Sequence, residues 1–349
     1  MLVEIFRLFN EDLAEIDFLP PPRDKSKQGA ALSRVNDAAG RVLAGRYELV
    51  EQIGEGGMAV VWRAIQRGSS PFKRAVAVKR IRSVLARSTE TLEMFAEEAR
   101  VGCELQHPNI VGVLDYGFDE NGEAFLVTEL VNGMHFGDWV VGHVRFGIET
   151  PWELTAAIGV EVLRGLDAAH TRLDANGEVS PILHRDVTPP NILLDESGSV
   201  KLADFGLARA MDRDRLTRPE IVKGKAAYLS PELVRGEPPS VQSDLFAVGI
   251  VLWEALSGNR LFKGENEVMS ALLVRDAKVP MLGLKRPNLP LGVSAIVHRA
   301  LEREPANRFG SAREMLEALR GTLRILPHST DSFLLRDSVV EARKRLAAS

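Results

Sequence analysis

The sequence predicts an α+β protein with two lobes, strands in the first and helices in the second. Its 349 residues suffice for about two domains of ordinary size, and 45% of them are apolar, so a packed core can form. Residues 46–53, 75–81, 111–114 and 124–127 alternate or are β-branched in the manner of strands. From Pro151 onward, apolar residues recur at helical spacing. We therefore expect a small antiparallel sheet followed by a mainly helical part.

The overall composition argues against several classes of protein. The net charge is −4 with both signs interspersed, whereas a nucleic-acid binder usually carries a basic surplus. Cys103 is the single cysteine, which excludes an intrachain disulfide and suits a reducing compartment. No apolar run approaches the ~18 residues of a membrane span, and the first residues do not resemble a secretion signal. We expect a cytoplasmic chain without a transmembrane segment.

The first 44 residues read as an extension. Apolar residues between Leu2 and Ile16 share one face of a predicted helix, which Pro20 and the prolines after it would end. The polar residues 23–44 read as a linker. Two interpretations of the helix remain: it packs on the protein's own surface, or it docks a regulatory partner.

A glycine-rich segment follows the first predicted strand, which covers residues 46–53. Gly54-Glu55-Gly56-Gly57-Met58-Ala59-Val60-Val61 leads into a second strand through Ala64. Glycines let backbone N–H groups approach a phosphate closely. Taken alone, the segment is a weak signal, and a plain hairpin turn would be the better interpretation.

One lysine lies inside the strand-like residues 75–81. A charge in such a β-branched run is costly unless it is paired, so Lys79 needs a carboxylate partner. Residues 89–105 read as a helix, and Glu93, Glu97 and Glu98 on it are the candidates.

The segment from His184 to Asn191 holds a carboxylate, Asp186, and a carboxamide, Asn191, five positions apart. Thirteen residues later comes Asp204-Phe205-Gly206. Phosphoryl transfer from a nucleotide needs a base that positions a hydroxyl, oxygen ligands for a metal, and cations on the phosphates. Asp186 suits the first task, and Asn191 and Asp204 suit the second.

Together these motifs resemble those of the bacterial eukaryotic-like (Hanks-type) serine/threonine protein kinases. The resemblance runs from about Arg46 to Arg320. It implies a bilobal protein-kinase fold: an N-lobe at residues 45–130 with a five-stranded sheet and one helix, and a mainly helical C-lobe at residues 131–325. It also implies ATP with Mg²⁺, or Mn²⁺ in its place, and protein substrates carrying Ser or Thr.

The resemblance assigns roles to particular residues. Asp186 would accept the hydroxyl proton, Asn191 and Asp204 would hold the metal, and Lys79 would lie on the phosphates. The spacing typical of the family selects Glu98 as the partner of Lys79, with Glu97 as the alternative. Thr128 takes the gatekeeper position. The implied nucleotide-binding residues are Ile53, Gly54, Glu55, Gly56, Gly57, Met58, Ala59, Val61, Ala77, Lys79, Thr128, Glu129, Val131 and Leu193.

Three further positions match structural or regulatory features of the family. Ser230-Pro231-Glu232 ends the activation segment, and Glu232 would pair with Arg308. Asp244 would anchor the backbone of the catalytic loop, which is the segment from His184 to Asn191. Thr217 is the predicted activating phosphosite, with a passive loop threonine as the alternative.

Two positions depart from the family pattern together. Thr188 stands two residues after Asp186, where these kinases usually carry a lysine that reaches the γ-phosphate. Gly224-Lys225 stands where they usually have Gly-Thr. Because a lysine side chain is long, we predict that Lys225 supplies the missing cation and that Thr188 orients Lys225 or Asp186.

Two other functions compete with a protein kinase. A pseudokinase would use the same fold as an ATP-binding scaffold or allosteric partner, but the base, metal and lysine positions are all filled. A small-molecule kinase is disfavoured by the complete activation segment. Residues 326–349 read as a tail with one apolar helical face, solvated by default and otherwise available for packing or for a homodimer contact.

Overall fold

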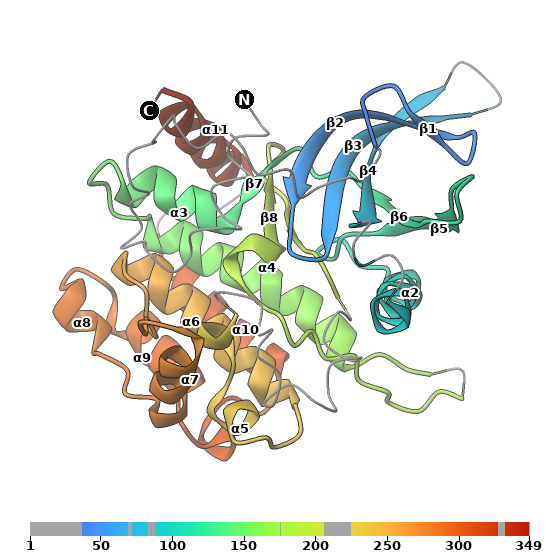
Figure 1. Cartoon of the computed structure of the whole chain (residues 1–349). Coiled ribbons are helices and arrows are strands. Elements are labelled where there is room, and N and C mark those ends of the chain that lie inside the picture. Colours follow the sequence, from blue (N-terminus) through green and yellow to red (C-terminus); the bar gives the residue numbers. More distant parts are fainter. Residues whose placement is uncertain are drawn as a thin grey trace.

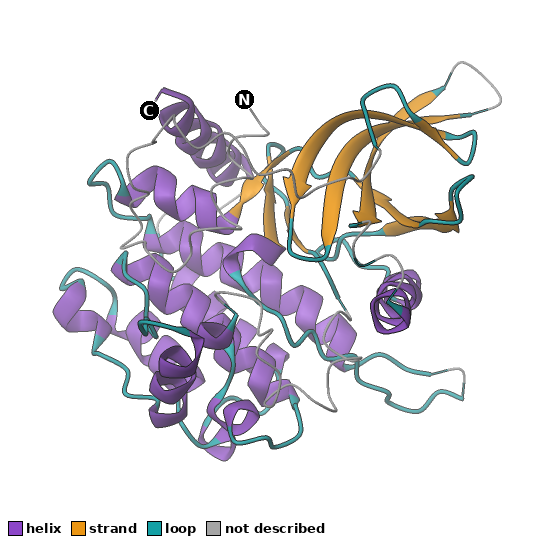
Figure 2. Ribbon diagram, in the orientation of Figure 1, coloured by secondary structure: helices purple, strands orange, loops and turns teal. Residues whose placement is uncertain are grey.

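The computed structural model describes residues 37–68, 72–82, 85, 88–174, 176–205, 225–326 and 332–348. Figure 1 shows that these residues form two lobes, and Figure 2 shows strands dominating one lobe and helices the other. The predicted bilobal α+β fold is therefore confirmed. The predicted helix at residues 1–19 and the predicted phosphosite Thr217 lie outside the described residues.

The N-lobe is built on an antiparallel sheet of six strands in the order β1-β2-β3-β4-β6-β5. The strands are β1 Val42–Leu43, β2 Tyr47–Glu55, β3 Ala59–Arg67, β4 Lys73–Ile81, β5 Val113–Phe118 and β6 Ala124–Glu129. The expected number of five was wrong by one strand. The additional strand is β1, whose two residues are too few to show the alternation that marks a strand in a sequence.

The residues just before the sheet are also part of the fold. The expected linker at residues 23–44 includes Asp37, whose carboxylate lies 3.0 Å from the guanidinium of Arg80. Arg80 is completely buried and also bonds Asp119 at 2.8 Å and Glu123 at 2.6 Å. The linker interpretation is therefore wrong for residues 37–44, because a buried ionic cluster and β1 attach them to the sheet.

Helix α2, Thr89–Glu104, packs against the sheet and confirms the helix expected at residues 89–105. The Ser88 hydroxyl caps its start by accepting a hydrogen bond from the Thr91 amide at 3.2 Å. Phe95 and Ala99 on one face of α2 join Leu126 of β6 in a small apolar cluster. This packing fixes the position of Glu98 relative to the sheet.

The C-lobe contains a three-stranded sheet in the order β7-β8-β9 and most of the helices. Its strands are β7 Gly133–His135, β8 Ile192–Asp195 and β9 Val200–Leu202. Its helices are α3 Phe136–Val144, α4 Trp152–His170, α5 Pro231–Val234, α6 Val241–Ser257, α7 Glu267–Asp276, α8 Leu282–Lys285, α9 Leu291–Ala300, α10 Ala312–Leu323 and α11 Ser332–Ala348, with 3-10 turns η1 Pro189–Asn191, η2 Ala226–Tyr228 and η3 Pro305–Asn307. Across the described part of the chain, no helix is both long and apolar enough to cross a membrane.

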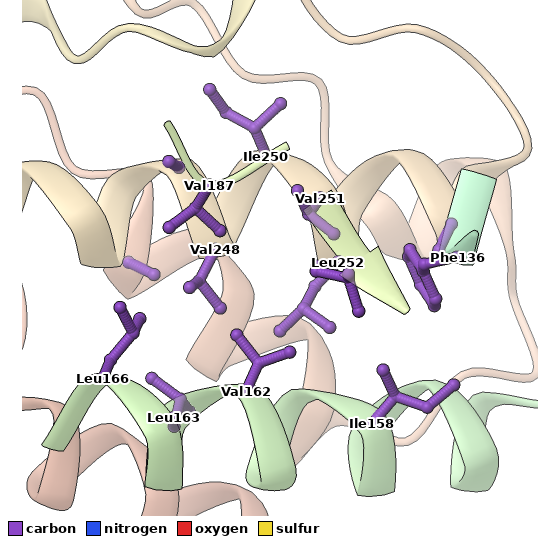
Figure 3. Close-up of a cluster of buried hydrophobic side chains, with 14 of the residues drawn as sticks. Phe136, Ile158, Val162, Leu163, Leu166, Val187, Val248, Ile250, Val251 and Leu252 are labelled. Atoms are coloured by element: carbon purple, nitrogen blue, oxygen red, sulfur yellow. The ribbon is translucent and has the colours of Figure 1, made fainter. Parts of the chain in front are cut away.

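The core of the C-lobe supports the catalytic loop directly. Figure 3 shows α4 and α6 side by side, with Leu163 and Leu166 of α4 facing Val248 of α6. Val187, the neighbour of Asp186 in sequence, lies in the same cluster and is almost completely buried. The loop is therefore held by core packing next to the residue expected to perform the chemistry.

The C-terminal helix α11 packs against α3, as Figure 1 shows beside the C-terminus. Leu335, Val339 and Ala342 belong to the C-lobe core cluster. The Trp139 indole donates to the Ser338 hydroxyl at 2.9 Å. The default expectation of a solvated tail was therefore wrong for this helix, whose apolar face is used within the chain.

Candidate active site

The lysine of β4 joins the two lobes. The Lys79 ammonium donates to Glu98 Oε1 of α2 at 2.8 Å and to Asp204 Oδ1, beyond β9, at 2.8 Å. Its side chain is only 14% exposed, so the two carboxylates offset the cost of burying its charge. Glu97, the alternative partner, instead bonds Arg100 on the outer face of α2.

Glu98 and Asp204 share the Lys79 ammonium, but their pKa values shift in opposite directions. Burial would lower the pKa of Lys79, but the charges of Asp204 and Glu98 outweigh it and raise that pKa. Burial raises the pKa of Glu98 to about 7, although Lys79 opposes this. For Asp204, attraction to Lys79 outweighs burial and lowers the pKa to about 2. Asp204 therefore remains ionised at neutral pH, as a metal ligand must.

The buried carboxylate of Asp244 anchors the backbone of the catalytic loop. Asp244 at the start of α6 accepts the backbone N–H groups of His184 at 2.9 Å and Arg185 at 2.7 Å, and it contacts His170 Nε2 at 2.8 Å. Burial alone would raise the pKa of Asp244, but the hydrogen bonds from His170 and the loop outweigh burial and lower it. Arg185 has a φ of 62°, a left-handed conformation that costs free energy in a residue other than glycine. The bonds to Asp244 help to hold the loop in that conformation.

Asp186 is oriented by two donors. The Asn191 amide donates to the Asp186 carbonyl at 2.8 Å and to its Oδ2 at 3.0 Å. The Lys225 ammonium donates to the same Oδ2 at 2.6 Å. Oδ1 receives no side-chain donor from the described residues, so this oxygen can accept a substrate hydroxyl.

The residues expected to hold a metal have suitable chemistry. Both bonds that Asn191 makes to Asp186 use its amide nitrogen, so its oxygen faces the other way. Asp204 has a φ of 61°, and buried Phe205 after it packs on the His184 ring at 4.4 Å between centroids. Within the described residues, no three His, Cys, Asp or Glu side chains form a metal cluster. A hard cation here would complete its oxygen shell from phosphates and water, as Mg²⁺ does at nucleotide sites.

The nucleotide-binding candidates come from both lobes. Ile53 of β2, Val61 of β3 and Leu193 of β8 are apolar side chains that the protein leaves half-buried. Ala77 of β4 lies opposite Thr128 of β6 in the sheet register. Apolar surfaces left uncovered in this way suit a flat aromatic base.

The glycine-rich segment forms the turn between β2 and β3. The Gly56 amide donates to the Ala59 carbonyl at 2.7 Å, which closes the turn. The Met58 carbonyl accepts the Arg82 amide at 2.9 Å, and the Arg82 side chain pairs with Glu55. A side chain at Gly57 would meet nothing within 4 Å, so packing within the described residues does not require a glycine there.

The segment after β6 is fixed by contacts that sequence reasoning missed. Glu129 Oε1 accepts the Gly112 amide at 2.8 Å and the Lys201 ammonium at 2.9 Å. Lys201 was not predicted, and its only signal was a charge between two apolar residues of a strand. These contacts anchor Glu129, which lies two residues before Val131 in the chain.

The end of the activation segment is anchored by an ion pair. The Arg308 guanidinium bonds both carboxylate oxygens of Glu232 at 2.8 Å, and both side chains are buried. Ser243 of α6 donates to Glu232 at 2.9 Å. The bidentate geometry holds this segment against the C-lobe.

Comparisons with known proteins agree with this geometry. The protein kinase domain family matches residues 47–319. The chain is 37% identical over 279 residues to the tyrosine-protein kinase MasK of Myxococcus xanthus, covering 79% of this chain and 42% of that protein. It is 36% identical over 284 residues to the serine/threonine-protein kinase PknA of Mycobacterium tuberculosis, covering 80% and 62%. The chain thus spans less than two thirds of these curated relatives.

Solved structures show the same relationship. The kinase domain of PknI from Mycobacterium tuberculosis superposes with a TM-score of 0.60 at 28% sequence identity, covering 81% of this chain and 98% of that one. The family match covers most of the chain and includes both lobes. The chain therefore belongs to the protein kinase domain family.

Proposed function

We propose that this protein transfers the γ-phosphoryl group of MgATP to Ser or Thr hydroxyls of proteins. The observation that supports this most strongly is a pair of side-chain clusters, one around Lys79 that links the two lobes and one around Asp186. Lys79 bonds Glu98 and Asp204, while Asn191 and Lys225 bond Asp186. A base, metal ligands and cations for the phosphates are the parts that phosphoryl transfer requires.

In the proposed reaction, Asp186 Oδ1 accepts a hydrogen bond from the substrate hydroxyl. The hydroxyl oxygen forms a bond to the γ-phosphorus, the bond from that phosphorus to the β–γ bridging oxygen breaks, and ADP leaves. The hydroxyl proton passes to Asp186. Lys79 would hold the α- and β-phosphates, and Asn191 and Asp204 would hold Mg²⁺, which would neutralise charge on the phosphates. Mn²⁺ in place of Mg²⁺ is expected to support the reaction as well.

The choice of Ser and Thr rests on the end of the activation segment. Tyr228-Leu229-Ser230-Pro231-Glu232 resembles the Ser/Thr type, and η2 and α5 bury most of these residues. The relatives carry both names, tyrosine-protein kinase for MasK and serine/threonine-protein kinase for PknA. The acceptor residue is therefore measured directly, with Ser, Thr and Tyr compared in one experiment.

The test incubates the protein with MgATP and a degenerate peptide library with Ser, Thr or Tyr at the fixed position. Mass spectrometry then maps the phosphorylated residues. We expect phosphate on Ser and Thr, and none with Asp186→Asn, which keeps the shape of the side chain but removes the base. Phosphate on Tyr alone would refute the specificity. ATP binding without any transfer by the parent would favour a pseudokinase scaffold.

A further inference from the structure

Lys225 places its ammonium on the catalytic carboxylate from an unexpected direction. Its Nζ lies 2.6 Å from Asp186 Oδ2, and its side chain is 42% exposed while that of Asp186 is 10% exposed. The ammonium therefore approaches Asp186 from the accessible side of the site. An approaching hydroxyl and phosphate would use that side too.

The backbone that carries Lys225 is firmly attached to the C-lobe. Lys225 immediately precedes η2, whose three residues are buried. The Ala226 amide donates to Glu267 Oε2 of α7 at 3.2 Å, and the Tyr228 hydroxyl donates to Glu254 of α6 at 2.8 Å. The origin of the lysine side chain is therefore fixed, although its tip is accessible.

Lys79 and Lys225 differ in the number of carboxylates that surround them. Lys79 already has two carboxylate partners, Glu98 and Asp204, whereas Asp186 is the only carboxylate within ion-pair distance of Lys225 in the described residues. The Lys225 ammonium therefore lies directly on the candidate base, where the substrate hydroxyl and the transferred phosphoryl group must meet.

Position 188 carries a short, buried side chain where a lysine would compete with Lys225. Thr188 is 6% exposed and lies between nearly buried Val187 and Pro189, so this position holds a short side chain. A lysine here would bring a second ammonium to the carboxylate that Lys225 occupies. A short side chain at position 188 is therefore compatible with a lysine at position 225.

Resting on the proposed function, we propose that Lys225 is a catalytic residue that binds the γ-phosphate of ATP. Its cation comes from the end of the activation segment, and Thr188 leaves room for it.

The first test measures nucleotide affinity, which needs no turnover. Calorimetry compares MgADP with the non-hydrolysable analogue MgAMP-PNP for the parent, Lys225→Thr and the control Lys278→Thr, an exposed lysine after α7. We expect Lys225→Thr to weaken AMP-PNP binding on the order of tenfold, the cost of one charge-assisted hydrogen bond, and to leave ADP binding unchanged. Equal losses for both nucleotides, or none, would overturn the γ-phosphate assignment.

The second test is a double-mutant cycle in the transfer rate. Lys225→Thr should lower kcat on the order of 10²-fold, and Thr188→Lys should lower it by crowding two ammonium groups. The double variant should recover at least tenfold over Lys225→Thr, since one cation is restored from the other backbone position. Strictly additive effects would overturn the exchange, and faster transfer by Lys225→Thr would identify the lysine as an inhibitory clamp.

The two tests separate failure of the inference from failure of the proposed function. Melting temperatures of all variants show which are folded, and Lys225→Thr at an accessible position decides the matter if Thr188→Lys does not fold. A parent that transfers no phosphate refutes the kinase activity, but the nucleotide comparison still decides whether Lys225 contacts the γ-phosphate. An active parent with an unimpaired Lys225→Thr variant refutes only the role of Lys225.

Discussion

Two neighbouring valines on α11 allow a sharp test of whether the C-terminal helix belongs to the kinase fold. Val339 is completely buried against α3 and the C-lobe core, whereas Val340 is half-exposed. Changing either valine to alanine removes the same atoms and alters helix propensity equally. Any difference in stability between the two variants therefore reports burial.

The expected cost of Val339→Ala follows from its position. Loss of two buried methyl groups costs about 0.8 kcal/mol each, and the cavity left beside α3 raises the total to about 2 to 3 kcal/mol. Val340→Ala should cost under about 1 kcal/mol. In a chain of this size, the Val339→Ala variant should melt about 3 to 4 °C below the parent.

Thermal and urea unfolding followed by circular dichroism measure both variants. Parallel measurement of tryptophan fluorescence is a useful addition, because Trp139, one of the four tryptophans, bonds Ser338 of α11. Indistinguishable midpoints for the two variants would mean that α11 does not pack on α3. The account of the C-terminal helix would then be wrong.

Three further predictions concern pH, regulation and the N-lobe edge. The folded-state pKa of Glu98 is raised to about 7, so its contribution to stability is greatest below its unfolded pKa and is lost as pH rises through about 7. The unfolding free energy of the parent relative to Glu98→Gln should therefore fall by up to about 3 kcal/mol between about pH 5 and pH 8, and a flat difference would contradict the raised pKa. If Thr217 is the activating phosphosite, Thr217→Ala should lose the activation that MgATP preincubation gives the phosphatase-treated parent; equal activation of both proteins would exclude this role. Asp37→Asn should lower stability by about 1 to 3 kcal/mol because it weakens the buried pairing of Arg80, whereas the exposed control Asp276→Asn should change it little; equal small effects would show that the N-terminal cluster is not structural.

The residues that could be predicted from the sequence are those that belong to a recognisable chemical motif. Lys79 stood out because a charge in a β-branched run needs a partner, and Asp186 and Asn191 were identified by their spacing. The prediction that Lys225 supplies a cation to the site was possible only because two departures from one pattern could be considered together, and its contact with Asp186 was not predicted. Such predictions are possible because the reaction requires these side chains at these spacings.

The parts that the sequence did not predict depend on tertiary contacts. The apolar face of α11 was visible, but a stripe of leucine, valine and alanine does not specify the surface it covers, and Trp139 is distant in sequence. Asp37 lies in a polar stretch, where a carboxylate is usually solvated, and only the fold brings Arg80 to it. Lys201 gave no sign that it would bond Glu129, since pairing across strands requires the register.

The proposed function requires that the side chains clustered around Lys79 and Asp186 transfer phosphate from MgATP. The most direct measurement is the initial rate of labelled phosphate transfer from MgATP to a protein acceptor, for the parent and for Lys79→Met, with circular dichroism to show that both are folded. We expect transfer by the parent and a loss on the order of 10²-fold or more in the variant, on the order of 3 kcal/mol of transition-state stabilisation. Comparable rates for the two proteins, or no transfer by a folded parent that binds MgATP, would contradict the proposed function.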